Sequence, residues 1–158
     1  MDGLGRESKD GLVYTGGFLR GERNGLGFLK DNDQTSILVS WSNGVRDGFG
    51  SESLQNGDVY DGDFKVNLKN GLGIYVHSDD NMTYTGAFEN SMRSGFGRLE
   101  SESFIYVGAW QNDQRNGLGY QTNKEGGSYF GYWKDDLRVG LGIEIGGAYE
   151  YKGEWEDD

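Results

Sequence analysis

The sequence predicts an all-β fold: an elongated, twisted single layer of stacked antiparallel β-hairpins that forms one array over residues 1–158. Two observations lead to this prediction. A segment of similar sequence returns every 22 to 24 residues, and its copies begin near residues 14, 37, 60, 84, 106, 129 and 151. Glycine supplies 29 of the 158 residues, well above its usual share of about 7%, and proline is absent. We therefore expect about six and a half stacked repeats.

Each repeat combines an aromatic strand with a glycine-rich strand. The first full copy, YTGGFLRGERNGLGF, begins at Tyr14. Alternation along an extended strand places Tyr14, Gly16 and Phe18 on one face, and Gly25 and Gly27 of the returning strand on the same face. Glycines have no side chain to obstruct the rings, so we expect both glycines of each G-x-G to be structural. A phosphate-binding loop is disfavoured, because no helical pattern follows any G-x-G.

Turn residues separate the strands. Between repeats, Asp10-Gly11 and Asn56-Gly57 are favoured signals for two-residue hairpins. Within the repeats, the turn position holds residue types that tolerate a left-handed conformation: Gly21, Gly44, Asn67, Ser91, Asp113 and Asp136. Stacking then aligns a ladder of rings formed by Phe18, Trp41, Phe64, Phe88, Trp110, Trp133 and Trp155.

The repeated pattern, Y-x-G-x-[FW]-x-x-G-x-x-x-G-x-G, resembles the MORN repeat (membrane occupation and recognition nexus). The resemblance covers nearly the whole chain, with residues 1–13 as the second half of a preceding repeat and a half copy from Tyr151. We therefore expect a fragment of a longer array. MORN arrays occur in membrane-junction proteins, ciliary spoke heads and cytoskeletal scaffolds, and beside kinase or methyltransferase domains. The resemblance implies tethering or scaffolding.

Several kinds of site are disfavoured by composition. The net charge of −11 argues against nucleic acid as a partner. Cysteine is absent, and the one histidine, His77, lies in an inter-repeat turn, where we expect a solvated loop residue. The acidic residues show no EF-hand spacing, so we expect no metal site. The sequence thus predicts a protein without enzymatic activity or a cofactor, located in the cytoplasm and associated with the cytoskeleton or a membrane.

A concave aromatic groove is the first candidate site, because aromatic side chains are typical anchors at interfaces. It would accept a helix or an extended peptide from a protein partner. The alternative is packing between repeats, and both hold together if the rings are partly exposed. The candidate residues are Tyr14, Phe18, Trp41, Tyr60, Phe64, Tyr84, Phe88, Tyr106, Trp110, Tyr129 and Trp133.

The second copy departs most from the repeat pattern. Ile37 and Val39 replace its tyrosine and its first glycine. This bulk either fills the groove locally or marks the centre of a partner contact. We expect it to fill the groove.

A basic row is the second candidate site. A basic residue stands two positions before each complete G-x-G: Arg23, Arg46, Lys69, Arg93, Arg115 and Arg138. Such a row could meet lipid head groups or an acidic partner, or each cation could instead brace its hairpin.

The function predicted from the sequence is a non-enzymatic scaffold. It would bind protein partners, or a second copy of itself as a homo-oligomer such as a dimer, through the groove or through exposed strand edges. One alternative is a platform that binds phosphoinositides or other anionic lipids and tethers a membrane. Another is an accessory module of a larger enzyme.

Overall fold

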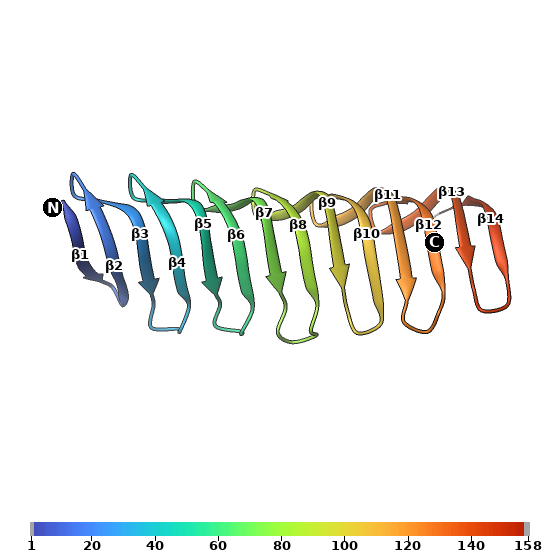
Figure 1. Ribbon diagram of the computed structural model, residues 1–158, viewed down its shortest axis with the longest axis horizontal. Helices are drawn as coiled ribbons and strands as arrows, with labels where there is room; N and C mark the ends of the chain where they lie inside the picture. The colour runs from blue at the N-terminus through green and yellow to red at the C-terminus, as the bar shows by residue number, and fades with distance from the viewer. Residues whose placement is uncertain (1, 157–158) are drawn as a thin grey trace. The chain divides into compact units, whose positions relative to one another are not determined.

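The computed structural model describes residues 2–156, which form 14 β-strands and contain no helix. The chain divides into two compact units, residues 1–79 and residues 80–158. Each unit is a single layer of antiparallel strands that follow one another in the order of the chain (Figure 1). The predicted all-β fold of antiparallel hairpins is confirmed.

The first unit contains seven strands, and each pairs with the next one along the chain. They are β1 (Gly3–Lys9), β2 (Leu12–Leu19), β3 (Glu22–Lys30), β4 (Ser36–Ser42), β5 (Val45–Ser53), β6 (Val59–Lys65) and β7 (Leu68–Val76).

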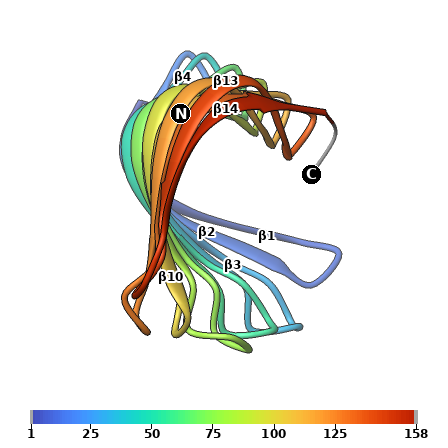
Figure 2. The ribbon, with the colours of Figure 1, turned by 90° about the vertical axis from the view of Figure 1, so that its right-hand side faces the viewer.

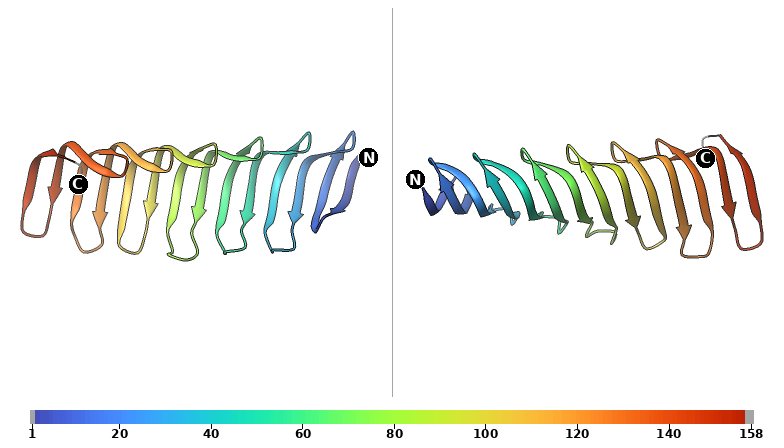
Figure 3. Two further views of the ribbon diagram at one scale, coloured as in Figure 1. Left: turned by 180° about the vertical axis from the view of Figure 1, so that it is seen from behind. Right: turned by 45° about the horizontal axis from the view of Figure 1, so that its top comes forward.

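The second unit repeats this arrangement with seven further strands, which Figure 3 shows from behind and with the top tilted forward. They are β8 (Thr83–Glu89), β9 (Met92–Glu100), β10 (Phe104–Gln111), β11 (Gln114–Asn123), β12 (Ser128–Lys134), β13 (Leu137–Ile145) and β14 (Glu150–Trp155). The strands of both units are bent rather than straight (Figure 2).

The turns within repeats have the predicted conformation. In the β2–β3 turn, Arg20 and Gly21 both have positive φ, of 53° and 84°. Positive φ at both central residues is the signature of a type I′ turn, whose twist matches that of the flanking strands. The other predicted turn residues also have positive φ: Gly44, Asn67, Ser91, Asp113 and Asp136.

The two hairpin signals between repeats differ in outcome. Asp10 and Gly11 both have positive φ, and the predicted two-residue turn is confirmed. The prediction for Asn56-Gly57 is wrong, because positive φ is found at Gly57 and not at Asn56. The loop is instead closed by hydrogen bonds from the Gly57 amide to the Leu54 carbonyl and from the Leu54 amide to the Asp58 carbonyl. Strand β6 therefore begins later than a tight hairpin would allow.

The two glycines of each G-x-G have different functions, which corrects the expectation that both make room for rings. A side chain at Gly27 would collide with the ring of Tyr14, whereas a side chain at Gly25 would meet open space. Gly25 is required for its backbone, because its φ is 77°. In every repeat the first glycine of the G-x-G is likewise left-handed, at Gly3, Gly48, Gly71, Gly95, Gly117 and Gly140.

A β-bulge in the glycine-rich strand of the repeat hairpins is a feature that the sequence analysis missed. The pairing of β2 with β3 passes from Gly16↔Gly27 to Phe18↔Arg23, so Gly17 of β2 faces residues 24–26 of β3, and the extra residues belong to β3. The Tyr14 hydroxyl bridges this bulge by donating a hydrogen bond to the Gly17 carbonyl at 3.0 Å. Hydroxyls of the equivalent tyrosines bond in the same way at Asp63, Ala87, Ala109 and Tyr132. Tyrosine is therefore preferred over phenylalanine at this position.

Candidate interaction surfaces

The residues predicted to line the aromatic groove form the core of each unit. All eleven are buried, with at most 9% of any of them exposed. The expectation that these rings are partly exposed is therefore wrong. The rings contact one another within repeats and between neighbouring repeats, and we call these eleven residues the ring column. Partner binding through the ring column stays a prediction.

Edge-to-face contacts join the rings within and between repeats. Tyr106 contacts Trp110 with a centroid distance of 5.2 Å and Trp133 of the next repeat at 5.4 Å, with interplanar angles close to 90°. Such pairs contribute about 0.5–1.5 kcal/mol beyond the area that they bury. Burial also raises the pKa of the Tyr84 hydroxyl to about 12, although the nearby Arg93 acts to lower it.

The second repeat fills the ring column with aliphatic side chains. Ile37 and Val39 are buried, and a side chain at Gly50 would collide with Val39. The prediction that these residues fill the groove is confirmed. Trp41 of the same strand keeps an edge-to-face contact with Tyr14, so the second repeat remains joined to the rings of the first.

The six residues of the predicted basic row lie against the ring column and pair with acidic groups. Their side chains are only 15–27% exposed. The guanidinium of Arg115 lies 4.1 Å from the ring centroid of Trp133, a cation–π contact. The ion pairs are Arg23–Glu7, Arg46–Glu52, Lys69–Glu52, Arg93–Asp113, Arg115–Asp136 and Arg138–Glu144.

Arg115 shows how the basic row joins successive repeats. Its Nε donates to Asp136 Oδ1 at 2.8 Å, and its Nη2 donates to the Asp136 carbonyl at 2.9 Å. The amide of Asp136 in turn donates to the Arg115 carbonyl. Arg93 and Asp113 form the same contacts one repeat earlier. This geometry favours the bracing interpretation of the row, and lipid binding through it stays a prediction.

His77 lies in a polar cluster at the end of β7. Its Nδ1 is buried and 3.6 Å from Oδ1 of the buried Asp58, so the expectation of a merely solvated side chain is wrong. Asp58 accepts hydrogen bonds from the Tyr75 hydroxyl at 2.7 Å and from the Ser78 amide at 3.0 Å. Burial acts to raise the pKa of Asp58, but these hydrogen bonds and His77 together lower it to about 2. The cluster fastens the 54–58 loop to the end of β7.

The face of the sheet opposite the ring column carries an exposed apolar row that the sequence analysis missed. It consists of the middle residue of each G-x-G, and we call it the outer row. Its residues are 45–90% exposed: Leu4, Leu26, Phe49 and Leu72 in the first unit, and Phe96, Leu118 and Leu141 in the second. The available signal was that this position is Leu or Phe in all seven copies.

Over residues 2–156, no helix has the length and apolar character that a bilayer span requires. In the same part of the chain, no group of three or more His, Asp or Glu side chains is arranged to hold a metal ion.

Comparison with known proteins identifies the repeat. The family model described as the MORN repeat matches residues 14–36, 40–59, 60–82, 84–103, 106–128 and 129–147. Alsin of Rattus norvegicus is 32% identical over 94 residues, and human alsin is 31% identical; each match covers 56% of this chain and 6% of alsin. The human ALS2 C-terminal-like protein is 33% identical over 94 residues, which are 10% of its length. The chain is thus similar to a small part of these relatives, and it belongs to the MORN-repeat family.

Proposed function

We propose that this chain is a non-catalytic scaffold module that binds protein partners through the outer row. The observation that carries the proposal is the exposure of a Leu or Phe side chain at the middle of every G-x-G. Contiguous exposed apolar surface on a folded protein is typical of an interaction site. Burying one such side chain is worth about 1.5–3 kcal/mol, so a few of them are sufficient for specific binding.

The burial of the ring column is the reason for placing the site on the opposite face. A partner cannot reach side chains that are already covered by their neighbours without opening the core, whereas the outer row needs no rearrangement. Self-association through the outer row is compatible with the same proposal, because two such faces would cover each other. An accessory function in a larger enzyme is compatible as well, since an interaction module can position a catalytic domain.

The lipid platform has less support. Each cation of the basic row is already engaged by a carboxylate, and the net charge of −11 opposes approach to an anionic surface. Lipid binding would therefore require these ion pairs to open.

Selection from a displayed peptide library tests the proposal. The wild-type chain is the target, and the counter-target is a variant with Leu26→Ser, Leu72→Ser, Leu118→Ser and Leu141→Ser. A matched control replaces four exposed apolar residues at or beside turns: Leu12→Ser, Leu19→Ser, Met92→Ser and Leu137→Ser. Peptides that bind wild type and control but not the outer-row variant are expected.

Two further measurements use the same three proteins. Binding to vesicles that contain phosphatidylserine tests the lipid platform, and light scattering measures self-association. Self-association that disappears in the outer-row variant would also support the proposal. Salt-sensitive vesicle binding without any selected peptide would overturn it in favour of the lipid platform.

A further inference from the structure

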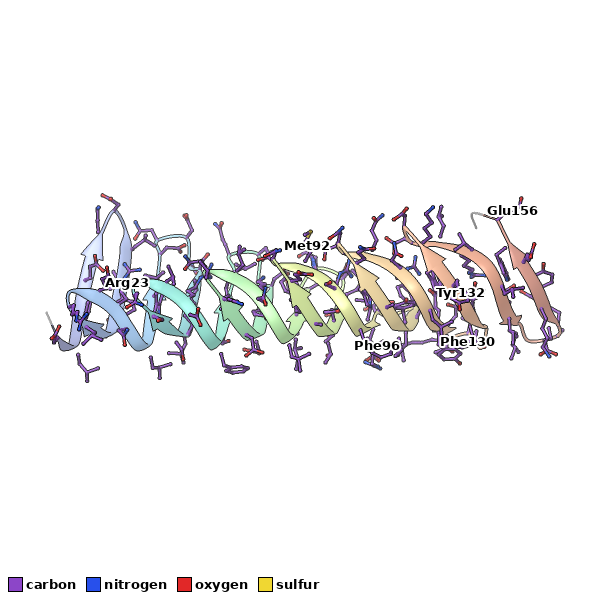
Figure 4. All side chains as sticks on the ribbon, turned by 90° about the horizontal axis from the view of Figure 1, so that it is seen from above. Arg23, Met92, Phe96, Phe130, Tyr132 and Glu156 are labelled. Atoms are coloured by element: carbon purple, nitrogen blue, oxygen red, sulfur yellow. The ribbon has the colours of Figure 1, made fainter. Side chains whose placement is uncertain are left out.

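The outer face of the second unit carries a denser apolar patch than the outer row alone. Six large apolar side chains on β9, β11, β12 and β13 are at least 42% exposed: Phe96, Leu118, Tyr120, Phe130, Tyr132 and Leu141. We call them the outer patch. Phe96 and Phe130 lie along the same margin of the sheet in Figure 4.

The outer patch forms two parallel rows that run across the strands. In the first row, Leu118 pairs with Tyr132. In the second row, Tyr120 pairs with Phe130, which pairs with Ile143, and a furrow separates the two rows. Between the rows, the glycines of neighbouring strands face each other in the order Gly119↔Gly131↔Gly142. The furrow therefore has apolar walls and a floor of backbone.

Glycine explains why the floor is bare. A Cβ built at Gly131 or Gly142 would point into the ring of Tyr129, on the inner side of the sheet. Nothing therefore projects outward from these positions, and a hollow of about 560 Å³ remains. Its lining side chains are those of Leu118, Phe130, Tyr132, Leu141 and Ile143 and, from β14, that of Lys152. The hollow lies within the second unit.

The spacing of the furrow fits a helix better than an extended peptide. Strands follow one another at about 4.8 Å, and side chains on one face of a helix recur at about 5.4 Å, once per turn. Side chains on one face of an extended chain recur at roughly 6.6–7 Å. This repeat differs more from the strand spacing than the helical repeat does, so an extended peptide would match fewer successive strands. The five strands β9–β13 span about 19 Å, which about 13 helical residues cover.

The charge of the second unit indicates the polar character of the helix. Residues 80–158 contain 14 Asp and Glu against 7 Lys and Arg. Acidic residues border the outer patch on β14, where Glu154 lies directly opposite Leu141 and Glu150 forms an ion pair with Lys152. A helix with Lys or Arg beside its apolar stripe would complement this border.

We propose that the outer patch binds an amphipathic helix whose apolar stripe is flanked by basic residues. The helix lies across β9–β13, and its apolar side chains enter the glycine-floored furrow. This inference rests on the proposed function, because it assigns the partner class and the location of one site on the outer face. It involves residues of the second unit only.

The test uses a model helix of leucine and lysine, of about 18 residues, with leucine recurring on one face. Its binding to the intact chain is measured by fluorescence anisotropy. A peptide with the same composition in scrambled order, and a helix with glutamate in place of lysine, are the controls. Chemical-shift mapping of the chain locates the bound peptide.

The variants distinguish this site from the equivalent face of the first unit. Leu118→Ser and Leu141→Ser are each expected to weaken binding roughly tenfold, because each removes one buried apolar contact. The matched controls Leu26→Ser and Leu72→Ser occupy the same repeat position in the first unit and are expected to leave binding unchanged. The midpoint temperatures of thermal unfolding of all four variants should remain close to that of wild type, since these side chains are exposed.

Each contrary outcome overturns the inference without deciding the proposed function. Equal binding of the scrambled peptide would exclude recognition of a helix. Loss of binding only in Leu26→Ser and Leu72→Ser would place the site in the first unit. Chemical-shift changes confined to β1–β7 would lead to the same conclusion. If the model helix does not bind at all, the inference is wrong, while library selection still tests the scaffold function independently.

Discussion

The hydroxyl of Tyr106 donates a hydrogen bond of 3.0 Å to the carbonyl of Ala109, at the register shift between β10 and β11. The same bond recurs at the equivalent tyrosines of the other repeats that have one. It links the ring column to the local backbone at the point where the register between β10 and β11 shifts. The repeat thus depends on both the ring and the hydroxyl of its tyrosine.

Tyr106→Phe is expected to lower the free energy of unfolding by about 0.5–1.5 kcal/mol, since it removes this hydrogen bond and leaves the packing intact. Urea unfolding measures the effect. Tyr120→Phe is the control, because Tyr120 is exposed on the outer face, and a change within about 0.5 kcal/mol is expected there. Equal effects in the two variants would show that the bond does not stabilise the bulge.

Gly27→Ala and Gly25→Ala should differ, although both glycines belong to one G-x-G. A methyl group at Gly27 collides with the buried ring of Tyr14, so a loss of about 3 kcal/mol is expected. At Gly25 there is open space, and the cost is that of a left-handed alanine, about 1–2 kcal/mol.

Gly25→Asn tests whether backbone conformation is the reason for glycine at position 25, because asparagine tolerates positive φ better than alanine. We expect it to be more stable than Gly25→Ala in the same urea titration. An equal loss in both variants would mean that space, and not backbone conformation, selects glycine at this position.

Stability should depend on the ionisation of Asp58 at acidic pH. Its pKa in the folded protein is about 2, against 3.8 for the unperturbed group. Because the folded value is the lower one, the carboxylate stabilises the protein above about pH 4, and this contribution is lost as the pH falls towards about 2. The midpoint temperature of thermal unfolding should therefore fall more steeply through this pH window for the wild type than for Asp58→Asn. Asp79→Asn, in an exposed loop, should follow the wild-type curve.

Arg115→Ala is expected to destabilise the protein by about 1–2 kcal/mol, because it removes hydrogen bonds to Asp136 and the cation–π contact with Trp133. Lys134→Ala, at an exposed position of β12, is the matched control for loss of one positive charge. Chemical denaturation distinguishes the two. If Arg115→Ala is as stable as wild type, the basic row does not brace the repeats, and lipid binding through the row gains support.

Much of the fold follows from the repeat pattern. Alternation placed Tyr14 and Phe18 on one face correctly, and residue types at the turns predicted left-handed backbone at Asn67 and Asp136. Alternation along one strand could not predict the bulge, because the extra residues of β3 are recognised only from its pairing with β2. Asn56-Gly57 carried a hairpin signal, but the hydrogen bonds of Asp58 favoured a longer loop.

The surfaces were harder to predict than the fold. The rings of Tyr60 and Trp110 attract attention as anchors, but neighbouring repeats cover them, which a single repeat does not reveal. The exposed row that contains Leu26 and Phe49 was missed, although the strand position of these residues assigns them to the opposite face. Arg93 was noticed by its position, but its ion pair with Asp113 depends on how the next repeat stacks.

The most direct test of the central claim is chemical-shift mapping of a peptide recovered by library selection. The account predicts shifts at the methyl groups of the outer row, such as Leu118 and Leu141, while the indole resonances of the buried Trp110 and Trp133 remain unchanged. Shifts of those indole resonances with an unperturbed outer row would contradict it and would return the binding site to the ring column.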